Sequence, residues 1–106
     1  MQIYNLSDFK GGWFVGNFHP TLFPIKEAEV AIKRYKAGDY DAKHLHKESE
    51  EITIVVSGRV SMNGEVYVEN DVILIDKNEA TDFIALTDAI TCVVKIPSVK
   101  NDKYVV

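Results

Sequence analysis

Residues 43–51 read KHLHKESEE and hold two of the three histidines of this 106-residue chain. In an extended strand, the alternation of side chains puts His44 and His46 on one face. Glu51 begins the next apolar run and could lie beside them. Two imidazoles and one carboxylate suit Fe(II) and other divalent transition metals, and such a triad leaves coordination positions open for water or substrate. We therefore treat these three residues as candidate metal ligands. An exposed polar turn is the alternative interpretation.

The same cluster could transfer protons without a metal. A protonated His44 or His46 beside an ionised Glu51 would form a charge-assisted pair, and the carboxylate would raise the pKa of the histidine. Such a pair can act as a general acid or base. The two histidines are therefore also the candidate catalytic residues.

Composition limits the partners of the chain. Its net charge is −4, and its lysines are scattered among acids. A nucleic-acid-binding protein normally carries a basic stripe that neutralises phosphate, so we expect no nucleic-acid partner. The chain has no apolar run of about 18 residues, and its first residues lack the pattern of a signal peptide, which favours a cytoplasmic protein with no membrane segment. The single cysteine, Cys92, allows no internal disulfide, and its apolar surroundings in 90–96 predict a buried core residue.

Short segments rich in Val, Ile, Thr and aromatic residues follow one another along the chain, as strands do. Asn63-Gly64 can supply the positive φ angles of a hairpin turn. The expected strands are 13–18, 29–35, 51–56, 58–62, 65–68, 71–75, 82–86 and 89–96. Residues 26–37 contain good helix formers and are the one segment that could form a helix instead. Many short strands at regular spacing predict an all-β sandwich or small barrel.

Two of the expected strands are apolar on both faces. In 51–56, Ile52, Ile54 and Val56 alternate with Thr53 and Val55, and 72–75 is apolar throughout. A strand that is buried on both faces needs a cover on each side. The barrel interior is one cover. The other is either a second subunit, which would make the protein a homodimer, or residues 1–25.

The histidines belong to a longer pattern. Gly38, His44, His46, Glu51 and Gly58 stand at the spacing G-x5-H-x-H-x4-E-x6-G, which resembles the first motif of the cupin superfamily at all five positions. The resemblance covers about residues 28–97 and implies a small jelly-roll β-barrel, or double-stranded β-helix. It implies one domain, with 1–27 as an N-terminal strand or arm and 98–106 as a C-terminal tail. It also implies that the motif's histidines and glutamate point into the barrel and hold Fe, Mn, Ni or Zn, with no organic cofactor.

The second cupin motif, G-x5-P-x-G-x2-H-x3-N, aligns with residues 70–85 in spacing alone. At its five positions the chain has Asn70, Asp76, Asn78, Thr81 and Ala85. The usual fourth metal ligand is therefore replaced by a threonine, which is a weak ligand when un-ionised. A metal would be held by three residues plus water, or would take a further ligand from Asp82, through a β-bulge, or from His19.

The strand before the first motif offers further pocket residues. Lys33 and Tyr35 lie on one face of 29–35 and Arg34 lies on the other. Sequence alone does not say which face is interior. A cation in the pocket would favour an anionic ligand, although long cationic side chains are mostly exposed.

Three functions are consistent with these patterns. The first is a small metal-dependent cupin enzyme that acts on an anionic or carbohydrate-like ligand. The second is a metal-free isomerase or epimerase, because His44-x-His46-Lys47 resembles a motif of cupin-type sugar-nucleotide 3,4-ketoisomerases, in which histidines move protons. The third is a non-catalytic barrel that binds one small ligand.

Overall fold

The computed structural model describes residues 1–106 and consists almost entirely of strands. Two short 3-10 turns, η1 (Leu6–Asp8) and η2 (Lys10–Gly12), precede the strands β1 (Trp13–Val15), β2 (Glu29–Tyr35), β3 (Tyr40–Leu45), β4 (Glu50–Ser57), β5 (Arg59–Met62), β6 (Glu65–Val68), β7 (Val72–Ile75), β8 (Thr81–Ala85), β9 (Ala89–Ile96) and β10 (Tyr104–Val105). The segment that could have been a helix is strand β2. The predicted all-β class is confirmed.

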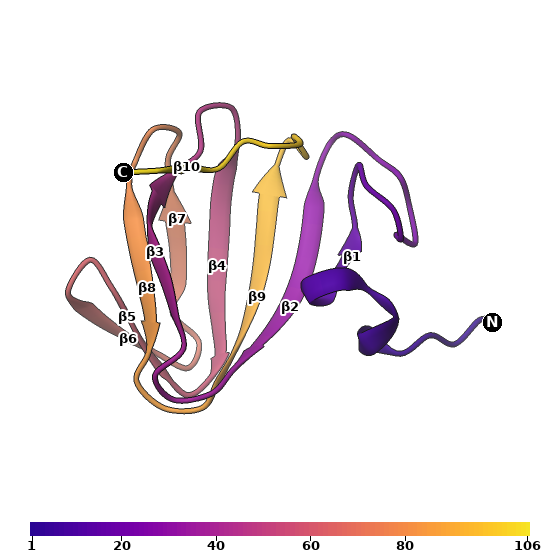
Figure 1. The fold of residues 1–106 in the computed structure, drawn as a ribbon. Helices are drawn as coiled ribbons and strands as arrows, with labels where there is room; N and C mark the ends of the chain where they lie inside the picture. The colour runs from indigo at the N-terminus through magenta and orange to yellow at the C-terminus, as the bar shows by residue number, and fades with distance from the viewer.

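The strands form two antiparallel sheets of five strands each, in the orders β1-β2-β9-β4-β7 and β10-β3-β8-β5-β6 (Figure 1). This arrangement is the predicted jelly-roll barrel. The hairpin between β5 and β6 turns at Asn63 and Gly64, which have φ values of 51° and 81°. These positive angles suit a type I′ turn, whose twist matches that of the flanking strands.

An apolar core fills one end of the barrel. It consists of Val55, Val60, Met62, Ile75, Phe83, Ala85 and Ala89, with Tyr35, Tyr67 and Ile73 packed against it. Phe83 is buried, as the pattern predicts, but Leu86 is 44% exposed. The apolar pattern of residues 82–86 predicts both Phe83 and Leu86 in the core, and for Leu86 this is wrong because it lies beyond the end of β8 at Ala85, in the bend that follows.

The sheet that contains β2, β9, β4 and β7 has very different inner and outer faces. Its inner face carries the row Glu29, Lys95, Glu51 and Ile75 near the open end of the barrel. Its outer face carries two complete apolar rows: Val30, Val94, Ile52 and Leu74, then Ile32, Cys92, Ile54 and Val72. Cys92 is half-buried on this outer face, so the prediction that it lies in the core is wrong.

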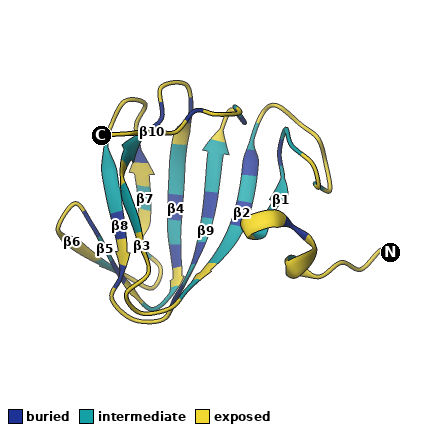
Figure 2. Ribbon diagram, viewed as in Figure 1, coloured by how far each residue is buried: buried dark blue, intermediate teal, exposed yellow.

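The N-terminal segment covers only one edge of that outer face. Gly12 approaches β2 so closely that a β-carbon there would clash with the carbonyl oxygen of Ile32. From Gly12 toward the N-terminus the chain runs away from the barrel (Figure 1). At the other edge of the sheet, Val72 and Leu74 on β7 are 64% and 58% exposed (Figure 2). Residues 1–25 therefore do not supply the whole second cover. None of the helical turns could span a membrane.

Candidate functional site

A cavity of about 210 Å³ opens between the two sheets above the apolar core. Its polar and charged lining comes from both sheets and consists of Lys33, Tyr35, Asp41, His44, Glu51, Thr53, Thr81, Asp82, Thr91, Lys95 and Lys103. Trp13, Met62, Phe83 and Val93 complete its walls. We call this space the barrel cavity.

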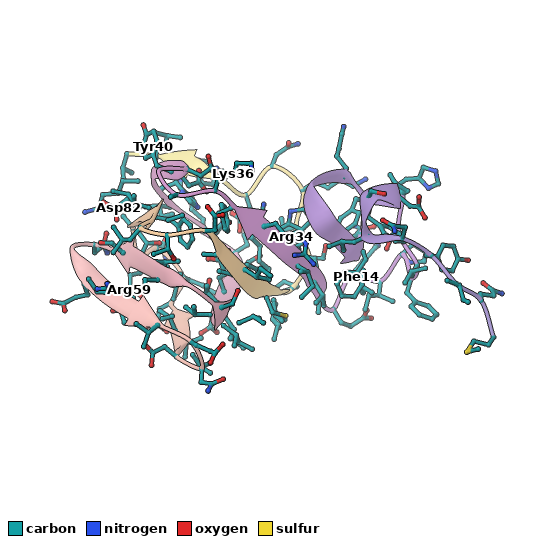
Figure 3. All side chains as sticks on the ribbon, turned by 90° about the horizontal axis from the view of Figure 1, so that it is seen from below. Phe14, Arg34, Lys36, Tyr40, Arg59 and Asp82 are labelled. Atoms are coloured by element: carbon teal, nitrogen blue, oxygen red, sulfur yellow. The ribbon has the colours of Figure 1, made fainter.

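The pairing of β2 with β9 decides which residues of β2 point inward. Lys33 pairs with Thr91, and Tyr35 pairs with Ala89, both of which are buried. Lys33 and Tyr35 therefore line the barrel cavity, whereas Arg34 is exposed beside the N-terminal segment (Figure 3). Burial raises the pKa of Tyr35 to about 12, so its hydroxyl keeps its proton at neutral pH.

Lys33 and Lys95 form a cationic pair around one indole. Their ammonium nitrogens lie 5.4 Å and 5.1 Å from the ring centroid of Trp13. The only salt bridge of the molecule joins Lys103 to Asp41 at 2.9 Å, so neither of these lysines has a carboxylate partner. Burial lowers the pKa of Lys33, the negative charge of Asp41 opposes that shift, and the positive charge of Lys95 adds to it. An anion entering the cavity would act in the same direction as Asp41 and stabilise the charged form of Lys33.

His44 is held from β3 in a defined orientation. A register shift between Asp41 and His44 marks a bulge, and beyond it His44 pairs with Thr81 on β8. Its Nδ1 lies 2.7 Å from the carbonyl oxygen of Ala42. Because a carbonyl oxygen can only accept, Nδ1 carries the proton, and Nε2 is the nitrogen left free to accept one.

His46 lies beyond the end of β3, in the loop to β4. Its ring meets that of His44 edge-on, with centroids 5.2 Å apart, so the two imidazoles are neighbours. They line different spaces, however. His44 lines the barrel cavity, and His46 lines a second cavity of about 360 Å³. His46 is 5% exposed, and its Nε2 has no hydrogen-bond partner.

The electrostatics of His46 differ from the predicted rise in pKa. Burial is the largest cause and the positive charge of Lys95 adds to it, so the pKa of His46 is lowered to about 4. The expectation of a raised value is wrong for this residue because Glu51 lines the barrel cavity and not the space that His46 lines.

Glu51 lies at the start of β4, next to Lys95 of β9 in the inner row. Burial raises the pKa of its carboxyl group, while the positive charge of Lys95 opposes that rise. Glu51 and His44 line the same cavity and are the two groups there best suited to exchange a proton with a ligand.

We tested whether these residues fit a divalent metal. No group of three or more His, Cys, Asp or Glu side chains is placed to hold a metal ion. The two histidines are neighbours and each has a ring nitrogen without a protein partner, but Glu51 does not join them in one donor set. The side chains as they lie therefore do not fit a metal held by three protein ligands.

The further ligands considered from sequence are placed as follows. Thr81 lines the barrel cavity. Asp82 also lines it, but its Oδ1 accepts the backbone N–H of Asn63 at 2.7 Å. Figure 3 shows Asp82 well separated from Arg34. His19 is exposed and lines neither cavity.

Sequence reasoning missed Asp102, which fixes the loop that holds His46. Its buried carboxylate accepts the backbone N–H groups of Lys47, Glu48 and Ser49 at 3.0–3.3 Å. Burial alone would raise the pKa of Asp102, but these three hydrogen bonds lower it below the ordinary value. Next to it in the chain, β10 pairs with β3 at Leu45 and His44. The C-terminal segment is therefore part of the site's framework.

Lys95 was missed for a different reason. The signal was present, since alternation in β9 places it on the same face as Thr91 and Val93. Only the three-dimensional pairing shows that this face is the inner one.

Comparisons with known proteins support the fold. No protein-family model matches the chain, and no curated protein matches it either. Among solved structures it is similar to KdgF of a Halomonas species, with a TM-score of 0.65 and 18% identity over 73% of this chain and 76% of that one. It is similar to a Klebsiella pneumoniae protein with a double-stranded β-helix domain, with a TM-score of 0.67 and 16% identity over 92% and 85%.

A third similar structure is a sugar phosphate isomerase of the cupin superfamily from Silicibacter pomeroyi, with a TM-score of 0.64 and 20% identity over 70% of this chain and 53% of that one. The predicted likeness to cupins is thus confirmed at the level of the fold: the chain is a cupin-type double-stranded β-helix. Identities of 16–20% show the fold alone.

Proposed function

We propose that this protein binds a small anionic, carbohydrate-like molecule in the barrel cavity and transfers a proton on it, with His44 and Glu51 as the proton-transfer groups. The observation that carries the proposal is the pair of unpaired cations, Lys33 and Lys95, which face the same cavity as the imidazole and the carboxyl group. Both lysines are half-buried, and partial burial of a cation without a partner costs free energy that a bound anion would offset.

The size of the cavity limits the ligand. A volume of 210 Å³ equals that of roughly seven water molecules in the liquid. This favours a small hydroxy acid over a whole sugar nucleotide, whose nucleotide part would have to lie outside the barrel. Thr53, Thr81 and Thr91 also line the cavity. Hydroxyl-lined walls suit a hydroxylated ligand.

Proton transfer follows from how the two groups are held. His44 donates from Nδ1 to the backbone and keeps Nε2 free, so it can act as a base. Glu51 sits in the same cavity with a raised pKa, so it can hold a proton closer to neutral pH than an exposed carboxyl group can. A base and an acid facing one ligand are the requirement for isomerisation or epimerisation next to a carbonyl group.

Binding and chemistry are tested separately. Calorimetric titration should show that gluconate binds and that its neutral analogue glucitol does not, and Lys33→Gln with Lys95→Gln should weaken gluconate binding by at least tenfold. Incubation with 2-ketogluconate in D2O should exchange the hydrogen on C3 for deuterium, as followed by NMR, and His44→Gln or Glu51→Gln should abolish the exchange. Binding without exchange would identify a non-catalytic ligand-binding barrel. Failure of both gluconate and 2-ketogluconate to bind would overturn the proposal.

A metal-dependent function is the second candidate. The neighbouring rings of His44 and His46, and the unpartnered Nε2 of His46, are the observations in its favour. Since Glu51 is not placed with them, we derive no step through a metal. Elemental analysis of untagged protein, with His44→Ala/His46→Ala as the control, tests this candidate. Stoichiometric Fe, Mn, Ni or Zn that disappears in the control would establish it.

We also propose that the protein is a homodimer that forms through the outer face of β2, β9, β4 and β7. Four strands spaced about 4.8 Å apart, each contributing about six residues, give a patch of roughly 20 by 20 Å, which is the order of one side of a small protein interface. The two rows at its centre contain no charge, so they have nothing to pair with a charged partner. A second copy offers the same flat apolar surface, and two such sheets can pack face to face.

The dimer is tested by sedimentation equilibrium, which should give twice the 12.0 kDa mass of the chain at micromolar concentration. Cys92 lies within the patch, so its reaction with a thiol reagent should accelerate on dilution into the monomer range. A monomer at high concentration, or a thiol reactivity that does not change with dilution, would contradict this interface.

A further inference from the structure

We infer that the second cavity, on the far side of His46, is a subsite for another acidic group of the same ligand, so that the ligand is a small dianion. This inference rests on the proposed function of the barrel cavity. The second cavity has a volume of about 360 Å³ and lies next to the barrel cavity, because Lys95 and Lys103 line both. The rings of His44 and His46 meet edge-on, and each residue lines one of the two cavities.

The walls of the second cavity are fixed by hydrogen bonds from separate parts of the chain. Asp102 holds the loop after β3 through three backbone N–H groups. Ser49 Oγ donates to the carbonyl oxygen of Pro97 at 2.7 Å, and the backbone N–H of Asn17 donates to Ser98 Oγ at 2.9 Å. A polar cavity whose walls are already held in place is pre-organised to bind a ligand.

One buried side-chain nitrogen of the second cavity has no partner in the chain. His46 is 5% exposed and lines this cavity, and its Nε2 makes no hydrogen bond. Buried polar atoms are nearly always hydrogen-bonded in native proteins, so Nε2 needs a partner that the chain itself does not supply. A polar group of a ligand in this cavity would supply it.

The charges of the second cavity favour an anionic group. Both of its carboxylates are engaged, since Asp102 accepts backbone N–H groups and Glu29 accepts the hydroxyl of Ser98 at 3.3 Å. Lys95 and Lys100 have no carboxylate partner. Both carboxylates keep their charge, but the three lysines of the lining, Lys95, Lys100 and Lys103, outnumber them. Because Lys95 lines both cavities, it could contact either acidic group of a ligand that has two.

The test compares acids that differ in one group. Calorimetric titration is carried out with gluconate, which has one carboxylate, with glucarate, which has two on the same carbon chain, and with 6-phosphogluconate, whose second group is a phosphate. The variants are Lys100→Gln, which lines only the second cavity, and Lys77→Gln, an exposed lysine in neither cavity, as the matched control. Both substitutions are on the surface and should leave the fold intact.

We expect glucarate or 6-phosphogluconate to bind about tenfold more tightly than gluconate, and their relative affinity shows whether the subsite prefers carboxylate or phosphate. Lys100→Gln should weaken binding of the tighter acid about three- to fivefold, should leave gluconate unchanged, and should differ from Lys77→Gln. Equal affinities for all three acids, or equal effects of Lys100→Gln on gluconate and on the two acids with a second acidic group, would overturn the second subsite while gluconate binding still supported the proposed function. Failure of all three acids to bind would overturn both.

Discussion

In the sheet formed by β2, β9, β4 and β7, the polarity of the inner and outer faces is the reverse of what a lone barrel in water would need. Near the open end the inner face carries Glu29, Lys95 and Glu51, while the outer face carries rows made only of apolar residues. Burial of apolar surface drives folding, so charges inside and exposed apolar rows outside both cost stability. The two costs have separate explanations in our proposals: inside, Lys95 binds an acid and Glu51 exchanges a proton with it, and outside, the apolar rows bind a second copy.

The largest expected effect comes from placing a charge in the outer face. Ile54 lies between Cys92 of β9 and Val72 of β7 at the centre of the patch. Ile54→Asp would bury an unpaired carboxylate in the dimer, so the dissociation constant measured by sedimentation should rise at least 100-fold. Val66→Asp, a comparable change at a 49% exposed position on β6, should leave the dimer unchanged. Equal dissociation constants for the two variants would rule out the outer face as the dimer interface.

The next largest effect concerns Asp102, whose carboxylate holds the loop that contains His46. Asp102→Ala should lower the free energy of unfolding by about 2–4 kcal/mol, because three backbone N–H groups, two partly buried and one buried, lose a charged partner. Asp88→Ala is the control, since exposed Asp88 accepts only one backbone N–H, from Ala37, and should cost about 1 kcal/mol or less.

The same variant has a defined pH dependence. The pKa of Asp102 is lower in the folded protein than its ordinary value of 3.8, so its stabilisation is complete above that pH and is lost as the pH falls through the folded value. Urea titrations should therefore show a constant difference between wild type and Asp102→Ala above pH 5 that shrinks below pH 3.8. A difference that grows in acid would contradict the assignment.

The contribution of Glu51 to stability should change with pH in the opposite direction. Burial raises its pKa in the folded protein, so the folded state is stabilised at low pH and loses that stability as the pH rises from 4.5 through the folded value. Glu51→Gln should therefore increase the free energy of unfolding at pH 7 by roughly 1 kcal/mol while abolishing proton transfer. Below pH 4.5 wild type and variant should have similar stability. A variant that is less stable than wild type at pH 7 would show that the inner carboxylate is compensated by its surroundings.

The smallest effect is spectroscopic. The ring protons of His46 should titrate near pH 4 in the folded protein, and near 6.5 in urea, because burial and Lys95 disfavour the imidazolium. Since the folded value is the lower one, the stability linked to His46 is present above pH 6.5 and is lost as the pH falls through about 4. Titration near 6.5 in the folded state would mean that the ring is solvated and that the second cavity does not enclose it.

Sequence patterns predicted the fold well and the chemistry of its surfaces poorly. The strands from β4 to β9 follow local signals, such as the Asn63-Gly64 turn, that do not depend on distant contacts. Alternation shows that Lys33 and Arg34 face opposite ways, but only the pairing of β2 with β9 reveals that Lys33 is inside. An apolar face normally marks the interior, and here the more apolar face of the sheet is the outer one.

The site was only partly visible for a similar reason. The motif around His44 and Glu51 indicates a barrel cavity, and both residues line it. The separation of His46 into another space depends on where β3 ends and on a loop held by Asp102, which lies more than fifty residues away. No local pattern encodes a carboxylate that caps backbone groups at that distance.

The contacts of Asp102 also set an order on the folding of the chain. The loop that holds His46 closes onto a residue 53 to 55 positions later, and β10 joins β3 beside it. Closing such a span has an entropic cost before the hydrogen bonds form, so these contacts should be made late. The barrel's apolar end can assemble from residues 55–89, whereas both cavities become complete only when residues 98–105 have taken their places. A chain caught midway would have a formed core and no binding site.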